Sequence, residues 1–169
     1  TPDSIKSLIE LCSYDMTKIS TELKKLSCCS DDLTIDKKDI LSLVSADEEF
    51  QIFELTENLG NKNGEKVLKI LCNFLEKKEP IQNLFGLIAN HFRRVAHVSI
   101  SGMPENELAQ IFGVKEYAII KAKQQSKYFS KIQLKNILKL LEDVDEMIKS
   151  GKMSAENAIF YLVFKILYC

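Results

Sequence analysis

The sequence predicts an all-α protein, and three observations support that prediction. Glycine and proline are scarce, with six and three among 169 residues, so few points interrupt regular structure. Apolar residues recur at three- and four-residue steps, which is the period of an amphipathic helix. Polar residues suited to cap a helix stand directly before several of these segments. With 46% apolar and 28% charged residues, the composition is that of a globular protein.

Three short amphipathic helices are predicted within the first 45 residues. The first covers residues 3–12, the second follows Asp15 as its N-cap, and the third follows Thr34 as its N-cap, with Asp36 placed well for the helix dipole. The second helix has an apolar stripe made of Met16, Ile19, Leu23 and Leu26. Residues 1–47 contain six lysines against nine acidic residues, so this small bundle does not resemble a nucleic-acid-binding module.

A polar, acidic segment over residues 45–49 is the expected domain boundary, which divides the chain into 1–47 and 48–169. Beyond it, a helix over residues 50–60 is expected to end at Gly60. The next helix, over residues 64–78, has apolar residues on one face and lysines on the other.

The longest apolar stripe belongs to a helix predicted over residues 80–101, with Pro80 as its first residue. The stripe comprises Ile81, Leu84, Phe85, Ile88, Phe92, Val95 and Ala96. The opposite side comprises Asn83, Gly86, Asn90, Arg93, Arg94 and His97. Because so wide a stripe needs helices packed on more than one flank, we expect the second domain to be built around this segment.

Four further helices follow, predicted over residues 105–112, 115–129, 131–150 and 155–169. Gly113 is the expected turn between the first two of them. Ser130 and Gln133 form a capping box for the third, Gly151 ends it, and Ser154 caps the fourth. That last helix is apolar almost all round except for Lys165, and it is too short to span a bilayer. It is therefore either central to its own domain or covered by a partner.

No catalytic, metal or cofactor site is predicted. The sequence has no glycine-rich phosphate loop. His91 and His97, its only histidines, are six residues apart and do not share a helix face, so each is expected to be a satisfied or surface residue. Arg93 and Arg94 could bind phosphate, but a solvated face or an ion pair to a neighbouring helix is favoured. Carboxylates are scattered among lysines on helix exteriors.

The cysteines indicate reduced thiols and a cytoplasmic protein. There are five of them, Cys12, Cys28, Cys29, Cys72 and Cys169, without C-x-x-C spacing. The adjacent pair Cys28 and Cys29 could be a redox or metal site, but small buried hydrophobes are favoured. No signal peptide or membrane span is recognisable, so no membrane association is expected.

A helix-turn-helix DNA-binding regulator is the alternative function, and it would use residues 108–127. A helix-turn-helix has small residues, a turn-forming residue and apolar residues at fixed positions, and this segment has Ala109, Gly113, Val114, Ile119 and Ala122 there. It also has lysines on its second helix that could contact DNA, namely Lys115, Lys121, Lys123 and Lys127. Glu116 and a net charge of −1 weigh against this interpretation, and any two helices packed over a glycine turn have the same spacing.

The segments taken in order resemble the C-terminal half of the delta subunit of bacterial DNA polymerase III, a clamp-loader subunit. DMTKISTELKKL and LTIDKKDILSLVS are similar to the family's lid helices, and EEFQIFELTENLGNKNGEKVLKIL to its entry into the collar domain. The resemblance continues through LIANHFRRV and IFGVKEYAIIKAKQQSKYFS to LLEDVDEMIKSGKMSAENAIFYLVFKIL. Tyr14 stands where the family often has Asn, and residue 57 is not the usual Ala.

This resemblance implies an AAA+-like helical lid over residues 1–47 and a collar domain over residues 48–169. The collar would assemble with the delta-prime and gamma/tau subunits so that the complex can load the sliding clamp onto DNA. The sliding clamp would be contacted only by the family's N-terminal nucleotide-fold domain, which these residues do not include, and DNA only indirectly. The resemblance also implies a subunit of the DNA-directed DNA polymerase holoenzyme that hydrolyses no ATP.

Five residues of the last helix are the expected partner interface: Ile159, Phe160, Leu162, Val163 and Ile166. Unlike subunits packed in a ring make heterologous contacts, so each collar would present two different faces. Some of the five are expected to be core residues and the others interface residues.

Overall fold

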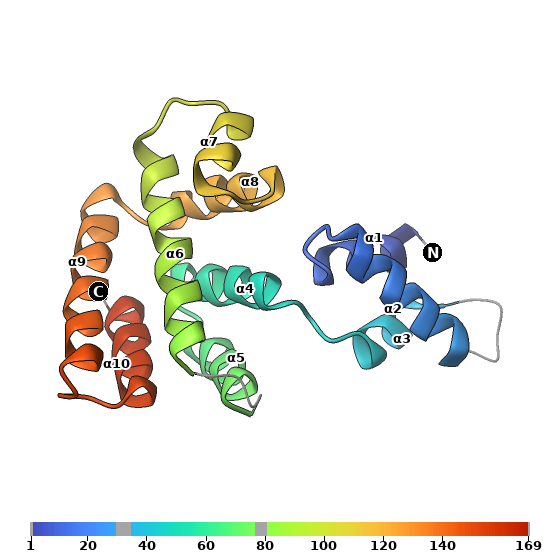
Figure 1. Cartoon of the computed structure of the whole chain (residues 1–169), viewed down its shortest axis with the longest axis horizontal. Helices are drawn as coiled ribbons and strands as arrows, with labels where there is room; N and C mark the ends of the chain where they lie inside the picture. Colours follow the sequence, from blue (N-terminus) through green and yellow to red (C-terminus); the bar gives the residue numbers. More distant parts are fainter. Residues whose placement is uncertain (1, 30–34, 77–80, 169) are drawn as a thin grey trace. The chain divides into compact units, whose positions relative to one another are not determined.

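A computed structural model describes residues 2–29, 35–76 and 81–168 of the chain (Figure 1). Within these residues it contains ten α-helices, one short 3₁₀ helix and no strand, which confirms the all-α prediction. The chain divides into two compact units, Thr1–Gln51 and Ile52–Cys169. The division falls inside a helix, about one turn beyond the expected end of the first domain at residue 47.

The first unit packs three helices around a small apolar core. They are α1 (Pro2–Leu11), α2 (Met16–Cys29) and α3 (Lys37–Leu43), followed by the first turn of α4 (Glu48–Gly60). The buried apolar residues are Leu8, Leu11, Cys12, Ile19, Leu26, Ile40 and Val44. Half of the stripe expected for α2 is not in this core, because Met16 is 76% exposed and Leu23 is 47% exposed.

Side-chain caps define where α2 and α3 begin. Asp15 Oδ1 accepts hydrogen bonds from the backbone N–H groups of Thr17 (2.9 Å) and Lys18 (3.1 Å), which confirms the predicted N-cap of α2. The N-cap of α3 is Asp36, whose own N–H donates to Asp39 Oδ2 at 2.7 Å. This helix therefore begins at Lys37, later than expected, and the predicted cap Thr34 lies outside the described residues.

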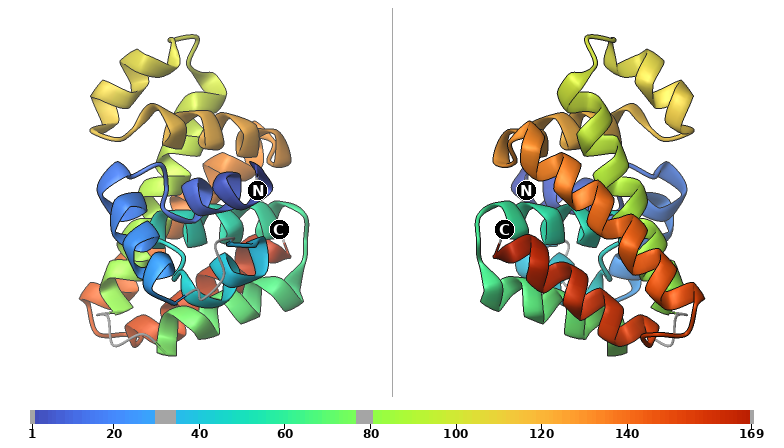
Figure 2. Two further views of the ribbon diagram at one scale, coloured as in Figure 1. Left: turned by 90° about the vertical axis from the view of Figure 1, so that its right-hand side faces the viewer. Right: turned by 90° about the vertical axis from the view of Figure 1, so that its left-hand side faces the viewer.

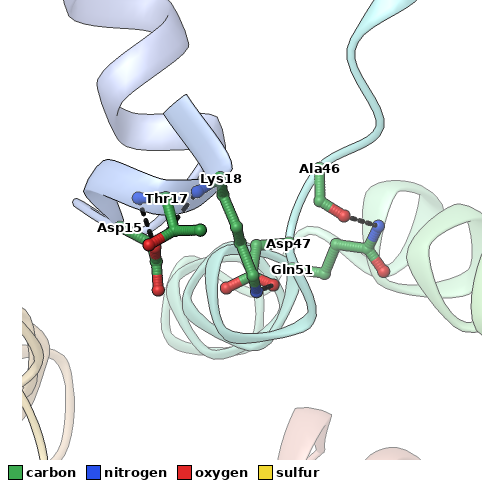
Figure 3. A network of polar contacts seen from close by, with 6 residues as sticks. All are labelled: Asp15, Thr17, Lys18, Ala46, Asp47 and Gln51. Carbon is green, nitrogen blue, oxygen red and sulfur yellow. Dashed lines mark hydrogen bonds and ion pairs between the residues drawn. The ribbon is translucent and has the colours of Figure 1, made fainter. Parts of the chain in front are cut away.

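The acidic segment before α4 is bound to the first unit through Asp47 (Figure 3). Its backbone N–H donates to the carbonyl oxygen of Leu11 at 2.9 Å, and its carboxylate forms an ion pair with Lys18. The side-chain hydrogen bond that Lys18 Nζ donates to this carboxylate raises the pKa of the Lys18 ammonium group. Gln51 Nε2 donates to the carbonyl oxygen of Ala46 at 3.1 Å. These contacts explain why the first turn of α4 belongs to the first unit rather than to the second.

The second unit is organised around α6 (Ile81–Ile100), as the sequence predicts. It contains the rest of α4 and then α5 (Gly64–Glu76), α7 (Glu105–Phe112), α8 (Glu116–Gln125), the 3₁₀ helix η1 (Ser126–Tyr128), α9 (Lys131–Lys149) and α10 (Ala155–Leu167). Helices α8, α9 and α10 pack against α6, and α10 also packs against α9 (Figures 1 and 2). Pro80, the expected first residue of α6, lies outside the described residues.

Most of the stripe predicted for α6 is confirmed as core, but one residue assigned to its polar side is not exposed. Leu84, Ile88, Phe92 and Val95 are buried. Arg94 was expected on the polar side and is instead only 7% exposed. Because neighbouring helices pack on several flanks of α6, they enclose part of its polar side as well, where the aliphatic stem of an arginine can pack.

The predicted start signals of α9 and α10 are confirmed. Ser130 Oγ accepts from the Gln133 N–H at 3.2 Å, and Gln133 Oε1 accepts from the Ser130 N–H at 2.9 Å, which completes the capping box. Ser154 Oγ accepts from the Asn157 N–H at 3.3 Å. Gly113 ends α7 with a φ of 62°, in the left-handed region that glycine adopts without strain.

Helix α4 ends at Gly60, as predicted, but Gly60 is not the left-handed residue of this helix end. The left-handed residue after α4 is Lys62, with a φ of 57°, and the N–H of Asn63 bonds to the carbonyl oxygen of Asn58. Gly60 lies at the end of α4 against Tyr128, and a Cβ at this position would be 2.5 Å from Tyr128 Cβ. Glycine is therefore required by close packing.

We expect Gly60→Ala to destabilise the second unit by about 1–3 kcal/mol, because the added methyl group overpacks this contact. The matched control is Gly86→Ala in α6, where the added methyl group would meet nothing within 4 Å other than the backbone of its own helix and its chain neighbours. That variant should gain about 0.5–1 kcal/mol, since alanine is the better helix former. Urea unfolding followed by circular dichroism measures both changes. Equal effects of the two substitutions would contradict the close contact with Tyr128.

Candidate subunit interface

The predicted interface helix, α10, buries one broad face within its own unit. Its buried apolar residues are Ala158, Ile159, Leu162, Val163, Ile166 and Leu167. Four of the five predicted interface residues are therefore core residues, at 0–2% exposure, and only Phe160 is partly exposed. A polar substitution at any of these four buried residues would disturb folding of the unit, so it would not report on association alone.

Two aromatic residues that the sequence analysis missed are exposed at the C-terminal end of α10, Phe164 in its last turn and Tyr168 as its C-cap. Phe164 is 57% exposed and Tyr168 is 72% exposed. They are one turn apart, with ring centroids 4.9 Å from each other, and we call them the α10 aromatic pair. Asn157 lies seven residues before Phe164 and hence on the same side of the helix. This polar residue was the signal that could have identified the exposed face.

A buried polar cluster joins three helices of the second unit. His91 Nε2 of α6 lies 2.7 Å from Gln125 Oε1 of α8, and Gln125 Nε2 donates to the carbonyl oxygen of Phe53 in α4 at 2.8 Å. The ring of Phe53 lies 5.2 Å from that of His91. Because a carbonyl can only accept, the amide oxygen of Gln125 must face His91, whose Nε2 therefore carries the proton.

His91 is a core histidine that is satisfied at one ring nitrogen only: Nε2 is hydrogen-bonded to Gln125, whereas the buried Nδ1 has no hydrogen-bond partner among the described residues. Its side chain is completely buried, and this burial, together with the nearby charge of Arg94, lowers its pKa to about 3. The ring is neutral at physiological pH. No group of three metal-binding side chains exists among the residues that the structure describes. The cluster therefore positions helices and offers no general acid or base near neutral pH.

The lysines of the alternative DNA-binding motif do not form one free row. Lys123 Nζ pairs with Glu105 Oε1 at 2.5 Å, and Lys121 lies over the ring of Tyr117, 5.5 Å from its centroid. Lys115 is the N-cap of α8. The apolar pattern of the motif is confirmed as ordinary packing, since Ala109, Ile119 and Ala122 are buried.

The cysteines differ in part from expectation. Cys12, Cys28 and Cys72 are free thiols. Cys12 is buried, which raises its pKa, but Cys28 is exposed and is thus not the buried hydrophobe that was predicted. The side chain of Cys29, like the whole of Cys169, lies outside the described residues. Over the described helices, none has the length and apolar character needed to cross a membrane.

Comparisons with known proteins agree with the arrangement of helices. Residues 49–166 match the family model of the DNA polymerase III delta subunit, C-terminal domain. The chain is 25% identical over 171 aligned positions to DNA polymerase III subunit delta of Bacillus subtilis, an alignment that covers 98% of this chain and 49% of that protein. The chain thus spans about half the length of this curated relative.

A solved structure has the same fold. It is the Bacillus subtilis DNA clamp loader delta protein (YqeN), which superposes with a TM-score of 0.89 at 24% identity, over 100% of this chain and 51% of that one. The family match includes both helices of the alternative DNA-binding motif, so these helices are part of the delta C-terminal domain. By this match the chain belongs to the family of the DNA polymerase III delta subunit, C-terminal domain.

Proposed function

We propose that this chain is a clamp-loader component whose second unit associates with the other clamp-loader subunits. The observation that supports this most strongly is the family match over residues 49–166, which covers nearly the whole second unit. In this proposal residues 48–169 are the collar domain and residues 1–47 are the helical lid. The protein would act in the cytoplasm, and we assign to these residues no ATP hydrolysis and no contact with the sliding clamp.

The α10 aromatic pair is the surface that we propose for this association. Exposed aromatic side chains are costly to leave in water and are enriched at the energetic centres of protein interfaces. Phe164 lies on a helix whose other face is buried in the core, and Tyr168, the C-cap of that helix, is adjacent to it. The partners would be the delta-prime and gamma/tau subunits, each offering an apolar helix face of its own.

Replacing both aromatic residues, as Phe164→Ala together with Tyr168→Ala, is expected to weaken association with these subunits at least tenfold. Loss of interface aromatics typically costs about 1–4 kcal/mol, and 1.4 kcal/mol corresponds to a factor of ten. Size-exclusion chromatography and titration with purified delta-prime and gamma/tau subunits of the same organism would measure the change.

A matched control is Ile111→Ala on α7, a residue that is 60% exposed. This variant should bind within about threefold of the unmodified chain, which corresponds to less than 1 kcal/mol. The proposal fails if the unmodified chain associates with neither subunit. It also fails if the control weakens binding as much as the double variant does.

A further inference from the structure

Three lysines on the outer side of α9 form a regular positive row. Lys131, Lys135 and Lys139 are four residues apart, so they follow one side of the helix in steps of about 6 Å. All three are exposed, and none forms an ion pair with a carboxylate in the described part of the chain. We call these residues the α9 lysine row.

The second half of α9 contains four acidic residues, Glu142, Asp143, Asp145 and Glu146, and two of them have basic partners. Lys149 Nζ lies 2.6 Å from Asp145 Oδ2, and Lys152 Nζ lies 3.6 Å from Glu146 Oε1. The lysines at the start of the helix thus have no paired carboxylate, and Asp143, one step beyond Lys139 on the same side of the helix, marks the C-terminal end of the positive row.

This row does not serve the stability of α9. Like charges four residues apart repel each other by about 0.2–0.5 kcal/mol per pair, and the row contains two such pairs. Lys131 is the first residue of the helix, where the dipole favours negative charge, and the first turn contains no acidic residue. A positive row retained against these local costs indicates an anionic partner.

We propose that the α9 lysine row binds the phosphate backbone of duplex DNA. The row spans about 12 Å along the helix. One strand of a duplex carries a phosphate for about every 3.4 Å of its axis, so the three ammonium groups can reach phosphates of one strand at the same time. Single-strand binders add aromatic side chains on which bases stack, and α9 contains no aromatic residue.

The choice of DNA among anionic partners rests on the proposed function, in which the protein works where a clamp is placed on DNA. The proposal goes beyond that function because it assigns a direct contact to residues for which only an indirect relation to DNA was expected. Its site is also separate from the α10 aromatic pair, so the two surfaces can be tested independently.

The test is a titration of a short fluorescently labelled duplex with the whole chain, without any other subunit, at several salt concentrations. Three phosphate contacts predict a slope of log K against log salt near −2.7, or about 40-fold weaker binding at 200 mM than at 50 mM salt. Replacing all three lysines of the row with glutamine should weaken binding at least tenfold and flatten the slope, since each lost contact removes about one unit of slope.

The matched control replaces three lysines of the alternative motif with glutamine: Lys115, Lys121 and Lys123. It removes the same charge, and we expect binding within about twofold of the unmodified chain, because two of these lysines already have partners. Absence of duplex binding at low salt would overturn the proposal. So would an equal loss in the control, or tighter binding to a single strand than to the duplex.

An acidic protein surface is the competing partner, and the same variants distinguish it. If the α9 variant binds DNA normally but loses association with the other subunits, the row is a protein contact and the proposal is wrong. Failure of the α10 aromatic pair to support association would leave the DNA titration unaffected, because that titration contains no partner subunit.

Discussion

Val163→Asp is expected to unfold the second unit, whereas Phe164→Asp, one residue further along α10, is expected to leave it folded. Val163 is 2% exposed, so aspartate there would place a carboxylate in an apolar core with no hydrogen-bond partner. Substitutions of this kind cost more than about 4 kcal/mol, a large part of the roughly 5–15 kcal/mol that stabilises a typical domain.

Phe164 is the matched comparison because the new residue, and hence its helix propensity, is the same. At 57% exposure its aspartate would remain solvated, and we expect a change within about 1 kcal/mol. Circular dichroism and urea unfolding of the whole chain measure both variants. A Val163→Asp protein with the native helical signal and an unchanged unfolding midpoint would show that the buried face of α10 is assigned incorrectly.

Acid is expected to destabilise the second unit partly through His91. Between pH 6.5 and about 3, the unfolded chain binds a proton at this imidazole that the folded chain does not bind. The contribution of neutral His91 is therefore complete above pH 6.5, and the free energy of unfolding falls as the pH is lowered. The maximum slope is about 1.4 kcal/mol per pH unit, and the loss between pH 6 and pH 4 is roughly 2–3 kcal/mol.

The His91→Gln variant isolates this effect, because glutamine can still donate to Gln125 Oε1 but does not titrate. Carboxylates elsewhere in the chain contribute equally to both proteins, so they cancel in the comparison. Urea unfolding at a series of pH values should show a steeper loss of stability in the unmodified chain than in the variant. Parallel curves would mean that His91 is not buried as a neutral ring.

The sequence was sufficient to predict features that depend on residues close together in the chain. The capping box of Ser130 and Gln133 is local chemistry, as is the glycine turn at Gly113. The central position of α6 followed from the width of its stripe, because such a stripe must be covered on several flanks. The resemblance to the delta subunit family was likewise visible in the sequence, because it depends on a series of short segments that occur in the same order.

Features that depend on tertiary packing could not be predicted in the same way. In an almost entirely apolar helix the apolar pattern alone does not separate buried Val163 from exposed Phe164, and the position of the polar residue Asn157 was the signal available for that distinction. The cluster around His91 was equally inaccessible. Gln125, the partner of His91, is 34 residues away. Gln125 in turn donates to the backbone carbonyl of Phe53, which has no sequence signature. The end of α4 at Gly60 was predicted, but the close contact of Gly60 with Tyr128 was not, because Tyr128 lies in η1, far away in the sequence.

The proposed association through α10 is tested most directly by photo-crosslinking from position 164. A photoreactive phenylalanine analogue would replace Phe164 in the whole chain, which is then mixed with the delta-prime and gamma/tau subunits and irradiated. The same analogue at Ile111 is the control, because that residue has a similar exposure. We predict crosslinks to another clamp-loader subunit from position 164 and few from position 111. An assembled complex without crosslinks from position 164, or with equal yields from both positions, would contradict the account.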